Sequence, residues 1–279
     1  MTKVRALALI HRRQQTALLR LMRTEFDAAR RRYDAAPAGA RTEQAWTATL
    51  AHLVHRFGTA SASLAAESYE QMRRAAGHRT PFTVLVADPP PLAQIAAARR
   101  WAANEARRAA DRAEAAERKA GADEATAAAA RTAPDLLRKA HDREAAAMQR
   151  LAALPGRRTI EKATRMDPAA LGWARITEGP CCSFCAVLIL RGPVYANRQS
   201  AETTVGGDPY HDRCDCTAEP VFKGQRWTPT PEAAEWEALY NSATRGVYGA
   251  DILRAFRRAF DAEHRQREPA DVTAAPMST

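Results

Sequence analysis

Every cysteine of the chain lies in two stretches: EGPCCSFCAVLILRGPVY, residues Glu178–Tyr195, and DPYHDRCDC, residues Asp208–Cys216. The rest of the 279-residue chain contains none, and the second stretch also carries a histidine. Cysteines that only fill a core would be scattered. The clustering therefore indicates that these side chains act together and organise the segment around them. The residues are Cys181, Cys182, Cys185, His211, Cys214 and Cys216.

The spacing of these residues is typical of a metal site. Cys182 and Cys185 form a C-x-x-C pair, and the second stretch reads H-x-x-C-x-C. A two-residue spacer lets both side chains face one tetrahedral ion, and thiolates combined with an imidazole favour Zn²⁺. Four ligand positions are open to five candidates. We expect Cys182, Cys185, His211 and Cys214 to bind, with Cys216 as a substitute for either of the last two and Cys181 as a non-ligand.

The alternatives to a structural metal site are a redox pair, unmetallated thiols, a disulfide and a catalytic zinc. A redox C-x-x-C pair would sit in a thioredoxin-like strand and helix pattern, which is missing. Unmetallated thiols, or a disulfide within assembled particles, stay open as alternatives. A catalytic zinc would need an open ligand position and a general base, but neither the H-x-E of zinc deaminases nor H-E-x-x-H occurs. G-x-S-x-G is absent as well. The sequence therefore predicts a closed, structural zinc site.

Composition limits the class of protein. Lys and Arg number 42 against 32 Asp and Glu, so the net charge is +10, carried almost wholly by arginine. Such a balance favours nucleic acid or an acidic partner, although arginine-rich coding alone is an alternative. No apolar run reaches the roughly 18 residues of a membrane span, and no secretory signal is recognisable. We therefore expect synthesis in the cytoplasm, no membrane contact and no disulfide framework.

Patterning predicts an α+β protein in four parts. Residues 1–155 form a mainly helical, basic region, and residues 156–227 form a small mixed α/β Cys/His module. C-terminal helices follow over 228–266, and the tail 267–279 is expected to be disordered.

Within the first part, Thr42 is expected to cap a helix whose buried face holds Trp46, Leu50, Leu53, Val54 and Phe57. An earlier basic helix has apolar residues at helical spacing: Leu7, Ile10, Ala17, Leu18 and Met22. The segment FTVLV is expected to be a short strand, and an Ala/Arg helix from Leu92 to about Ala130 should be exposed or pack on a partner chain. The next helix is expected to end at Pro155-Gly156.

The module and the C-terminal part carry further local signals. Asp167 is expected to cap a helix that begins in DPAAL, and Trp173 to anchor the core. AVLILRG is expected to be a short helix or strand, EPVF a closing strand, and Tyr195 should pack under the metal loop. TPTPEAAEWEAL marks a helix start. The last helix has an apolar stripe expected to pack within the chain: Ile252, Leu253, Phe256 and Phe260.

These motifs resemble the MuF-like minor head proteins of tailed bacteriophages. The ending HDRCDC followed by EPVF resembles that family's H-x-x-C-x-C and closing strand. The segment GRRTIEKATRMDPAALGWARITEGPCCSFCAVLILRGPVY is similar to the branch found in phages of actinobacteria. The resemblance covers about 156–225. Two departures are Cys181, where a small or acidic residue is expected, and Ile189-Leu190, which replace a small polar pair.

The resemblance implies a noncatalytic virion protein made beside the portal protein. It would associate with the portal or the inner capsid, in several copies on a ring, and assist head assembly, DNA packaging or genome release. The major capsid protein is a further possible partner. Some relatives are capsid maturation proteases, usually through a fused domain that is not recognisable here. A protease or zinc nuclease of the head is therefore the alternative, and a regulatory DNA-binding zinc module is a third.

The basic N-terminus has a place in this interpretation. Inside a DNA-filled head it would meet phosphate without reading bases. We predict contact with DNA or with an acidic portal face, and a solvated helix surface is the alternative. The residues concerned are Lys3, Arg5, Arg12, Arg13, Arg20, Arg23, Arg30, Arg31 and Arg32.

Overall fold

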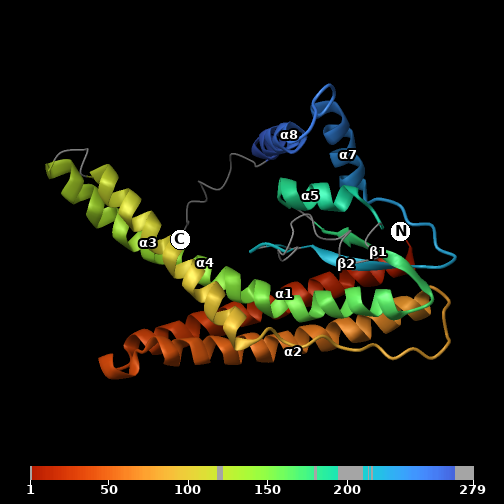
Figure 1. The fold of residues 1–279 in the computed structure, drawn as a ribbon, viewed down its shortest axis with the longest axis horizontal. Helices are drawn as coiled ribbons and strands as arrows, with labels where there is room; N and C mark the ends of the chain where they lie inside the picture. The colour runs from red at the N-terminus through yellow and green to blue at the C-terminus, as the bar shows by residue number, and fades with distance from the viewer. Residues whose placement is uncertain are drawn as a thin grey trace, which may run out of the picture.

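Three long helices form the body of the protein, with a small sheet and three shorter helices above them (Figure 1). The computed structural model describes residues 2–117, 122–178, 181–193, 210–212, 214 and 216–267. The predicted α+β class is confirmed, with helices on either side of a Cys/His cluster. In chain order the elements are α1 (Lys3–Ala35), η1 (Ala38–Ala40), α2 (Glu43–Ala75), α3 (Leu92–Glu117), α4 (Ala122–Met166), β1 (Ala170–Ile176), α5 (Ser183–Leu190), β2 (Thr217–Phe222), α7 (Pro231–Ala243) and α8 (Asp251–Arg267).

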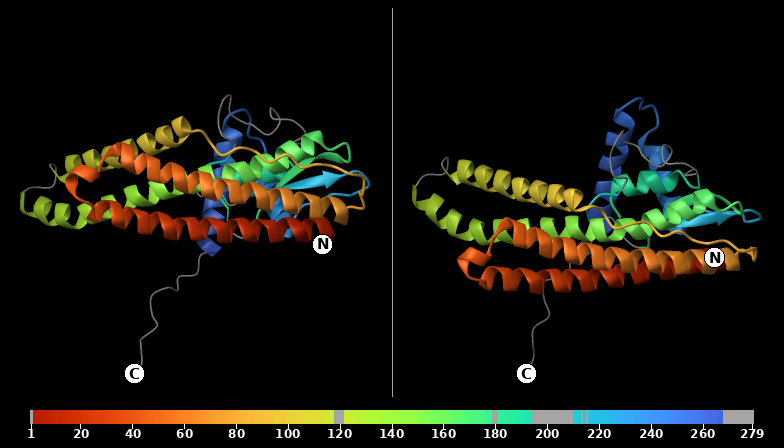
Figure 2. Two further views of the ribbon diagram at one scale, coloured as in Figure 1. Left: turned by 90° about the horizontal axis from the view of Figure 1, so that it is seen from below. Right: turned by 60° about the horizontal axis from the view of Figure 1, so that its bottom comes forward.

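The helices α1 and α2 form an antiparallel hairpin along which α4 lies (Figure 2). Each begins at a threonine cap: Thr2 accepts a hydrogen bond from the amide of Arg5, and Thr42 from that of Ala45, both at 3.1 Å. The predicted buried face of α2 is confirmed, since all five of its residues are buried. On α1, Met22 is buried as expected.

The first turns of α1 bury a different face from the one the spacing predicts. Ile10 is 46% exposed, whereas Val4 and Ala8 are buried. These two residues pack against Tyr69 of α2 and against Trp173 and Phe222 of the sheet. The sheet above α1 therefore decides which side of the helix is covered, and a helical wheel of α1 alone does not contain that information.

The helix α4 runs through Pro155-Gly156, so the predicted helix end there is wrong, and α4 crosses the boundary expected at 155/156. Proline removes one backbone donor, yet its ring packs where α2 offers Gly58: a Cβ on Gly58 would meet the Pro155 ring at 3.2 Å. Thr159 also donates to the Pro155 carbonyl oxygen at 2.8 Å. Tertiary packing thus outweighs the local signal.

Two further expectations for the first part need correction. Residues Phe82–Val86 are extended but pair with no strand, so the predicted strand is wrong. This segment lies along the helices, with Phe82 near Tyr69 and the Ala87 amide bonded to Thr159 Oγ1 at 2.9 Å. The helix predicted from Leu92 to about Ala130 begins as expected but ends earlier, because α3 stops at Glu117 and the residues from Ala122 already belong to α4. The helix α3 packs on α4 of the same chain, with Ile95 and Ala102 buried. Together they extend as an arm away from α1 and α2 (Figure 1).

The sheet consists of β1 and β2, which are antiparallel, with Trp173 opposite Pro220. Its core residue Trp173 is 1% exposed, and EPVF forms β2 as predicted. Asp167 does not cap a following helix. It ends α4, accepts the Ala169 amide at 2.9 Å and pairs with Arg73 of α2 at 2.8 Å. The strand β1 follows because this turn directs the chain back over α2 and α4.

The helices α5, α7 and α8 pack together as a cap above the sheet. AVLILRG falls in α5, and α7 starts with Thr230 as the cap and Pro231 at the first position, as predicted. Phe256 and Phe260 are buried against Trp236, but Leu253 is 57% exposed and lies outside the stripe. Most of the predicted tail, residues 268–279, and Tyr195 lie outside the described residues. Across the part of the chain that the structure describes, no helix is both long and apolar enough to cross a membrane.

The crossing of α1, α2 and α4 gives a testable prediction at Gly156. A Cβ there would lie 2.3 Å from Ser61 Oγ and 2.8 Å from the Ser61 carbonyl oxygen. Gly156→Ala should therefore destabilise the protein by about 1–3 kcal/mol, although alanine is the better helix former. Gly39→Ala is the matched control, because its Cβ would meet nothing within 4 Å. Urea unfolding of both variants checks this, and equal stability of Gly156→Ala and wild type would contradict it.

Candidate metal centre

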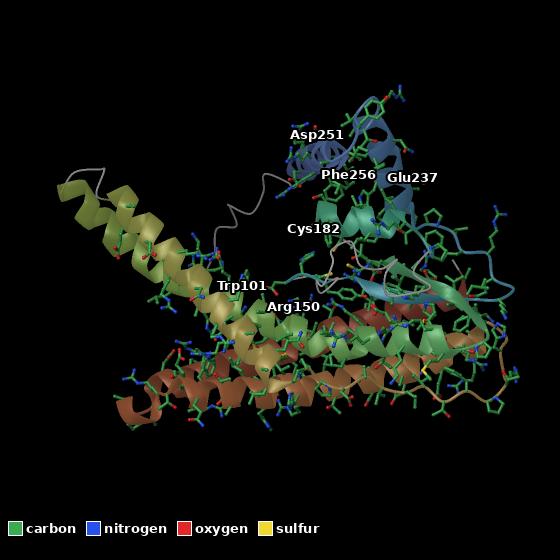
Figure 3. The ribbon with its side chains drawn as sticks, viewed as in Figure 1. Trp101, Arg150, Cys182, Glu237, Asp251 and Phe256 are labelled. Atoms are coloured by element: carbon green, nitrogen blue, oxygen red, sulfur yellow. The ribbon has the colours of Figure 1, made fainter. Side chains whose placement is uncertain are left out.

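The candidate ligands come from two stretches of the chain, one at the start of α5 and one before β2, and they meet beneath the cap. Cys182 precedes α5, where Figure 3 labels it, and Cys185 lies in its first turn. His211 lies in the loop before β2, and Cys214 and Cys216 lead directly into that strand. Leu154 of α4 packs under the sulfur atoms. The five residues, from two stretches of the sequence, therefore meet at one place between the cap, the sheet and the body.

The first group of ligand atoms joins α5 to the histidine. His211 Nε2 lies 3.1 Å from Cys182 Sγ and 3.1 Å from Cys185 Sγ. The other ring nitrogen, Nδ1, lies 2.6 Å from the Asp212 carbonyl oxygen, which assigns the ring proton to Nδ1. When the ring loses its second proton, Nε2 directs its lone pair toward the sulfurs, the arrangement usual for a metal-binding histidine.

The second group contains only sulfur. Cys185 Sγ lies 3.6 Å from Cys214 Sγ and 3.2 Å from Cys216 Sγ, and these last two are 3.0 Å apart. All three are buried. The separations far exceed the roughly 2.05 Å of a disulfide bond. A tetrahedral ion with bonds of roughly 2.3 Å to sulfur requires separations of about 3.8 Å. The Cys185–Cys214 separation is close to that value, and the two separations to Cys216 are shorter, so the sulfur atoms would move apart to bind an ion.

Cys185 belongs to both groups. Within the described residues, the sets whose ligand atoms all lie within 4.8 Å of one another are Cys182–Cys185–His211 and Cys185–Cys214–Cys216. The cluster could therefore hold a metal ion, with Cys185 common to either set. Cys181 is outside both sets and packs against the apolar side of the cluster, where burial raises the pKa of its thiol. Its predicted role as a non-ligand and the exact ligand set stay predictions.

Local electrostatics favour an ionised Cys182 thiol next to His211. Cys182 caps α5 and accepts the Cys185 amide at 3.4 Å. Contact with the Cys185 thiol and with His211 lowers the pKa of Cys182 to about 4, while the Cys182 sulfur raises the pKa of His211 to about 9. A thiolate beside an imidazolium is one proton away from the thiolate and neutral imidazole that bind a metal. The donor set thus fits a thiophilic ion such as zinc.

A polar shell fixes the loop that carries His211. Arg150 of α4, labelled in Figure 3, pairs with Asp212 at 2.7 Å. Arg157 donates to the Cys214 carbonyl oxygen at 2.5 Å. Tyr210 is 1% exposed and donates to Glu161 at 2.9 Å. Burial raises the pKa of Glu161, and burial likewise keeps the Tyr210 hydroxyl protonated. This shell is not predictable from the sequence, because one arginine among so many carries no signal. A tyrosine directly before the ligand histidine is the one local hint.

The basic residues of α1 divide into two groups. Five of them form ion pairs within the chain: Arg5 with Glu219, Arg12 and Arg13 with Glu178, Arg23 with Asp27 and Asp142, and Arg30 with Asp34. Arg5 and Arg12 are buried. The exposed remainder is Lys3, Arg20, Arg31 and Arg32. Contact of α1 with DNA or an acidic protein stays a prediction, and the structure concentrates it on these four residues.

Comparisons with known proteins place the chain among phage proteins. The sequence model of the family described as VG15 protein matches residues 1–243. The chain is 31% identical over 115 residues to the Gene 15 protein of Mycobacterium phage D29, covering 31% of this chain and 41% of that protein. The match therefore spans about two fifths of that relative's length. No solved structure matches the chain.

Because Cys185 belongs to both groups of ligand atoms, its substitution should abolish metal binding. Cys185→Ser removes a ligand from both groups, so the metal content of the purified full chain should fall from about one ion per chain to background. Cys181→Ser is the matched control and should retain the metal. Elemental analysis after dialysis checks both variants. Retention of metal by Cys185→Ser would contradict the assignment.

His11 of α1 predicts a pH dependence of stability. The residue is 1% exposed and shares a cavity of about 30 Å³ with Cys214 and Cys216. Burial lowers its pKa from 6.5 to about 4. The unfolded chain therefore takes up this proton near pH 6.5 but the folded chain does so only near pH 4, and the free energy of unfolding falls between these values.

His11→Gln removes this proton uptake and keeps a polar side chain. Between pH 7 and pH 4.5, wild type should lose about 2 kcal/mol more stability than the variant. Urea unfolding at the two pH values measures the difference, and acid release of a metal affects both proteins alike. Parallel losses in the two proteins would show that His11 does not titrate as stated.

Proposed function

The chain belongs to the VG15 protein family, and we propose that it is a noncatalytic structural protein of a bacteriophage head. That it is a bacteriophage protein follows from the family and from the D29 relative. The finer role proposed is that of a MuF-like minor head protein. It would sit at the portal or the inner capsid and assist head assembly, DNA packaging or genome release.

The observation that carries the proposal is the buried, thiol-rich cluster in a chain of a phage family. Cys185, Cys214 and Cys216 are buried and in mutual contact, so an ion bound there would be enclosed by sulfur. Catalytic zinc sites keep one position open to water, whereas structural sites are closed. When bound, zinc would supply a cross-link between α5 and the loop before β2. This chain's own residues hold that loop through Arg150, Arg157 and Tyr210.

The shape of the chain supports a role in an assembly. The arm of α3 and α4 extends from the body and exposes Trp101, labelled in Figure 3, at 52% and Leu137 at 73%. Large apolar side chains on an extended hairpin favour a protein partner. We propose the portal protein as that partner, with several copies on a ring, and the major capsid protein as a second contact. The exposed basic residues of α1 would face packaged DNA.

The proposed location is testable in phage particles. Mass spectrometry of purified heads should find the chain in few copies per head, and heads assembled without the portal protein should lack it. Heads assembled without this chain should still process their capsid protein normally, because the chain is proposed to be noncatalytic. Absence of the chain from purified heads would refute the virion role. Loss of capsid-protein processing, restored by the purified chain, would instead establish the protease alternative. Elemental analysis of the same chain should identify zinc.

A further inference from the structure

Two buried arginines from different elements lie beside the metal-binding residues. Arg157 of α4 is 8% exposed and Arg175 of β1 is 0% exposed. The ring of Tyr210 lies between them, with its centroid 4.1 Å from Cζ of Arg157 and 4.2 Å from Cζ of Arg175. Both distances are typical of close cation–π contacts. Because Tyr210 directly precedes His211, this stack fixes the start of the loop that carries three candidate ligands.

Arg157 reaches the same loop a second time. Its Nη2 donates to the Cys214 carbonyl oxygen at 2.5 Å, and the Cys214 amide is bonded to the His211 carbonyl oxygen at 3.1 Å. The H-x-x-C turn is therefore held by a guanidinium at one end and by the Tyr210 ring at the other. These contacts are made by side chains of α4 and β1, so the two elements hold the turn in place without help from a bound ion.

Several arginines lie around the cluster, and some of them pair with acidic residues. Asp212 is matched by Arg150 at 2.7 Å, and Glu178 pairs with both Arg12 and Arg13. A single buried carboxylate, Glu161, is associated with the Tyr210 stack in the described residues, and its Oε1 is 2.9 Å from the Tyr210 hydroxyl. Among the described residues, Arg157 and Arg175 thus place two buried guanidinium groups beside the Tyr210 stack and the cluster.

Buried charge is stable only where opposite charge compensates it. A divalent ion with two thiolates and two neutral ligands is uncharged, but three thiolates give a centre of charge −1 and four give −2. A thiolate-rich, anionic centre is the one that nearby guanidinium groups such as those of Arg157 and Arg175 stabilise. We propose that Arg157 and Arg175, with Tyr210 as the positioning residue between them, form a cationic clamp for an anionic metal centre. The centre has at least three of the thiolates of Cys182, Cys185, Cys214 and Cys216 as ligands. The inference rests on the proposed structural metal site.

The clamp is tested by zinc affinity of the full chain, measured by competition with a chromophoric chelator. Arg157→Met and Arg175→Met should each weaken zinc binding about 10–100-fold, the usual effect of losing a group that supports a ligand. Arg157→Lys should restore part of the affinity, because it restores the charge. Tyr210→Phe should keep the stack and the affinity, whereas Tyr210→Leu should lose both.

Arg73→Met is the matched control for lost burial and stability. Arg73 is 7% exposed, pairs with Asp167 at 2.8 Å and lies 5.6 Å from the Phe82 ring, away from the cluster. Its removal should lower the melting temperature and leave zinc affinity unchanged. The sulfur-to-metal charge-transfer absorption of the cobalt-substituted wild type gives a second readout, and its intensity should correspond to three or four thiolates.

The possible failures separate the clamp from the site on which it rests. If the wild-type chain takes up no zinc, the metal site is wrong and the clamp with it. If zinc binds but Arg157→Met and Arg175→Met bind it as tightly as wild type, the clamp alone is overturned. An equal loss of affinity in Arg73→Met, or a cobalt spectrum with two thiolates, would also overturn the clamp.

Discussion

The contacts of Cys185 with both His211 and Cys216 join the cap of α5, α7 and α8 to the sheet and to the body of α1, α2 and α4. α5 carries Cys185 and is the element through which α7 and α8 reach the rest of the chain. The loop of His211 and the strand β2 belong to the sheet, which lies on α1, α2 and α4. Leu154 of α4 closes the cluster from below. A contact made at one sulfur therefore joins a cap with a small core of its own to a body built of long helices.

A small core explains why such a contact matters. The cap buries Trp236, Phe256 and Phe260 with few other large side chains. Domains with so little apolar surface to bury usually need a disulfide or a metal as a cross-link. The cysteines here are free and come together in sets of three. A metal ion bound there would add binding free energy directly to folding, since the ligands do not converge in an unfolded chain.

Local signals in the sequence predict the Cys/His cluster and the starts of α2 and α7. Where a prediction from the sequence is wrong, contacts between distant elements determine the structure. C-x-x-C, H-x-x-C-x-C, Thr42 and Thr230 act over three or four residues, which a sequence shows directly. The course of α4 through Pro155-Gly156 depends instead on Gly58 of another helix, and the turn at Asp167 depends on Arg73. The Tyr210 stack requires α4, β1 and the loop at once. The sequence contains the residues of this stack, but their spacing gives no reason to group them.

The distribution of arginine shows the same limit and changes the meaning of the net charge. A count of +10 favours a polyanionic partner, but Arg5, Arg73 and Arg175 are buried within the chain. Removing one partner of a buried pair such as Arg5–Glu219 leaves an uncompensated charge, which costs about 3–5 kcal/mol. These arginines therefore specify how α1, α2 and the sheet fit together and contribute little to an external field. The exposed remainder on α1 is the smaller set of Lys3, Arg20, Arg31 and Arg32, so an external polyanion would meet these four side chains and not the charge that the whole count suggests.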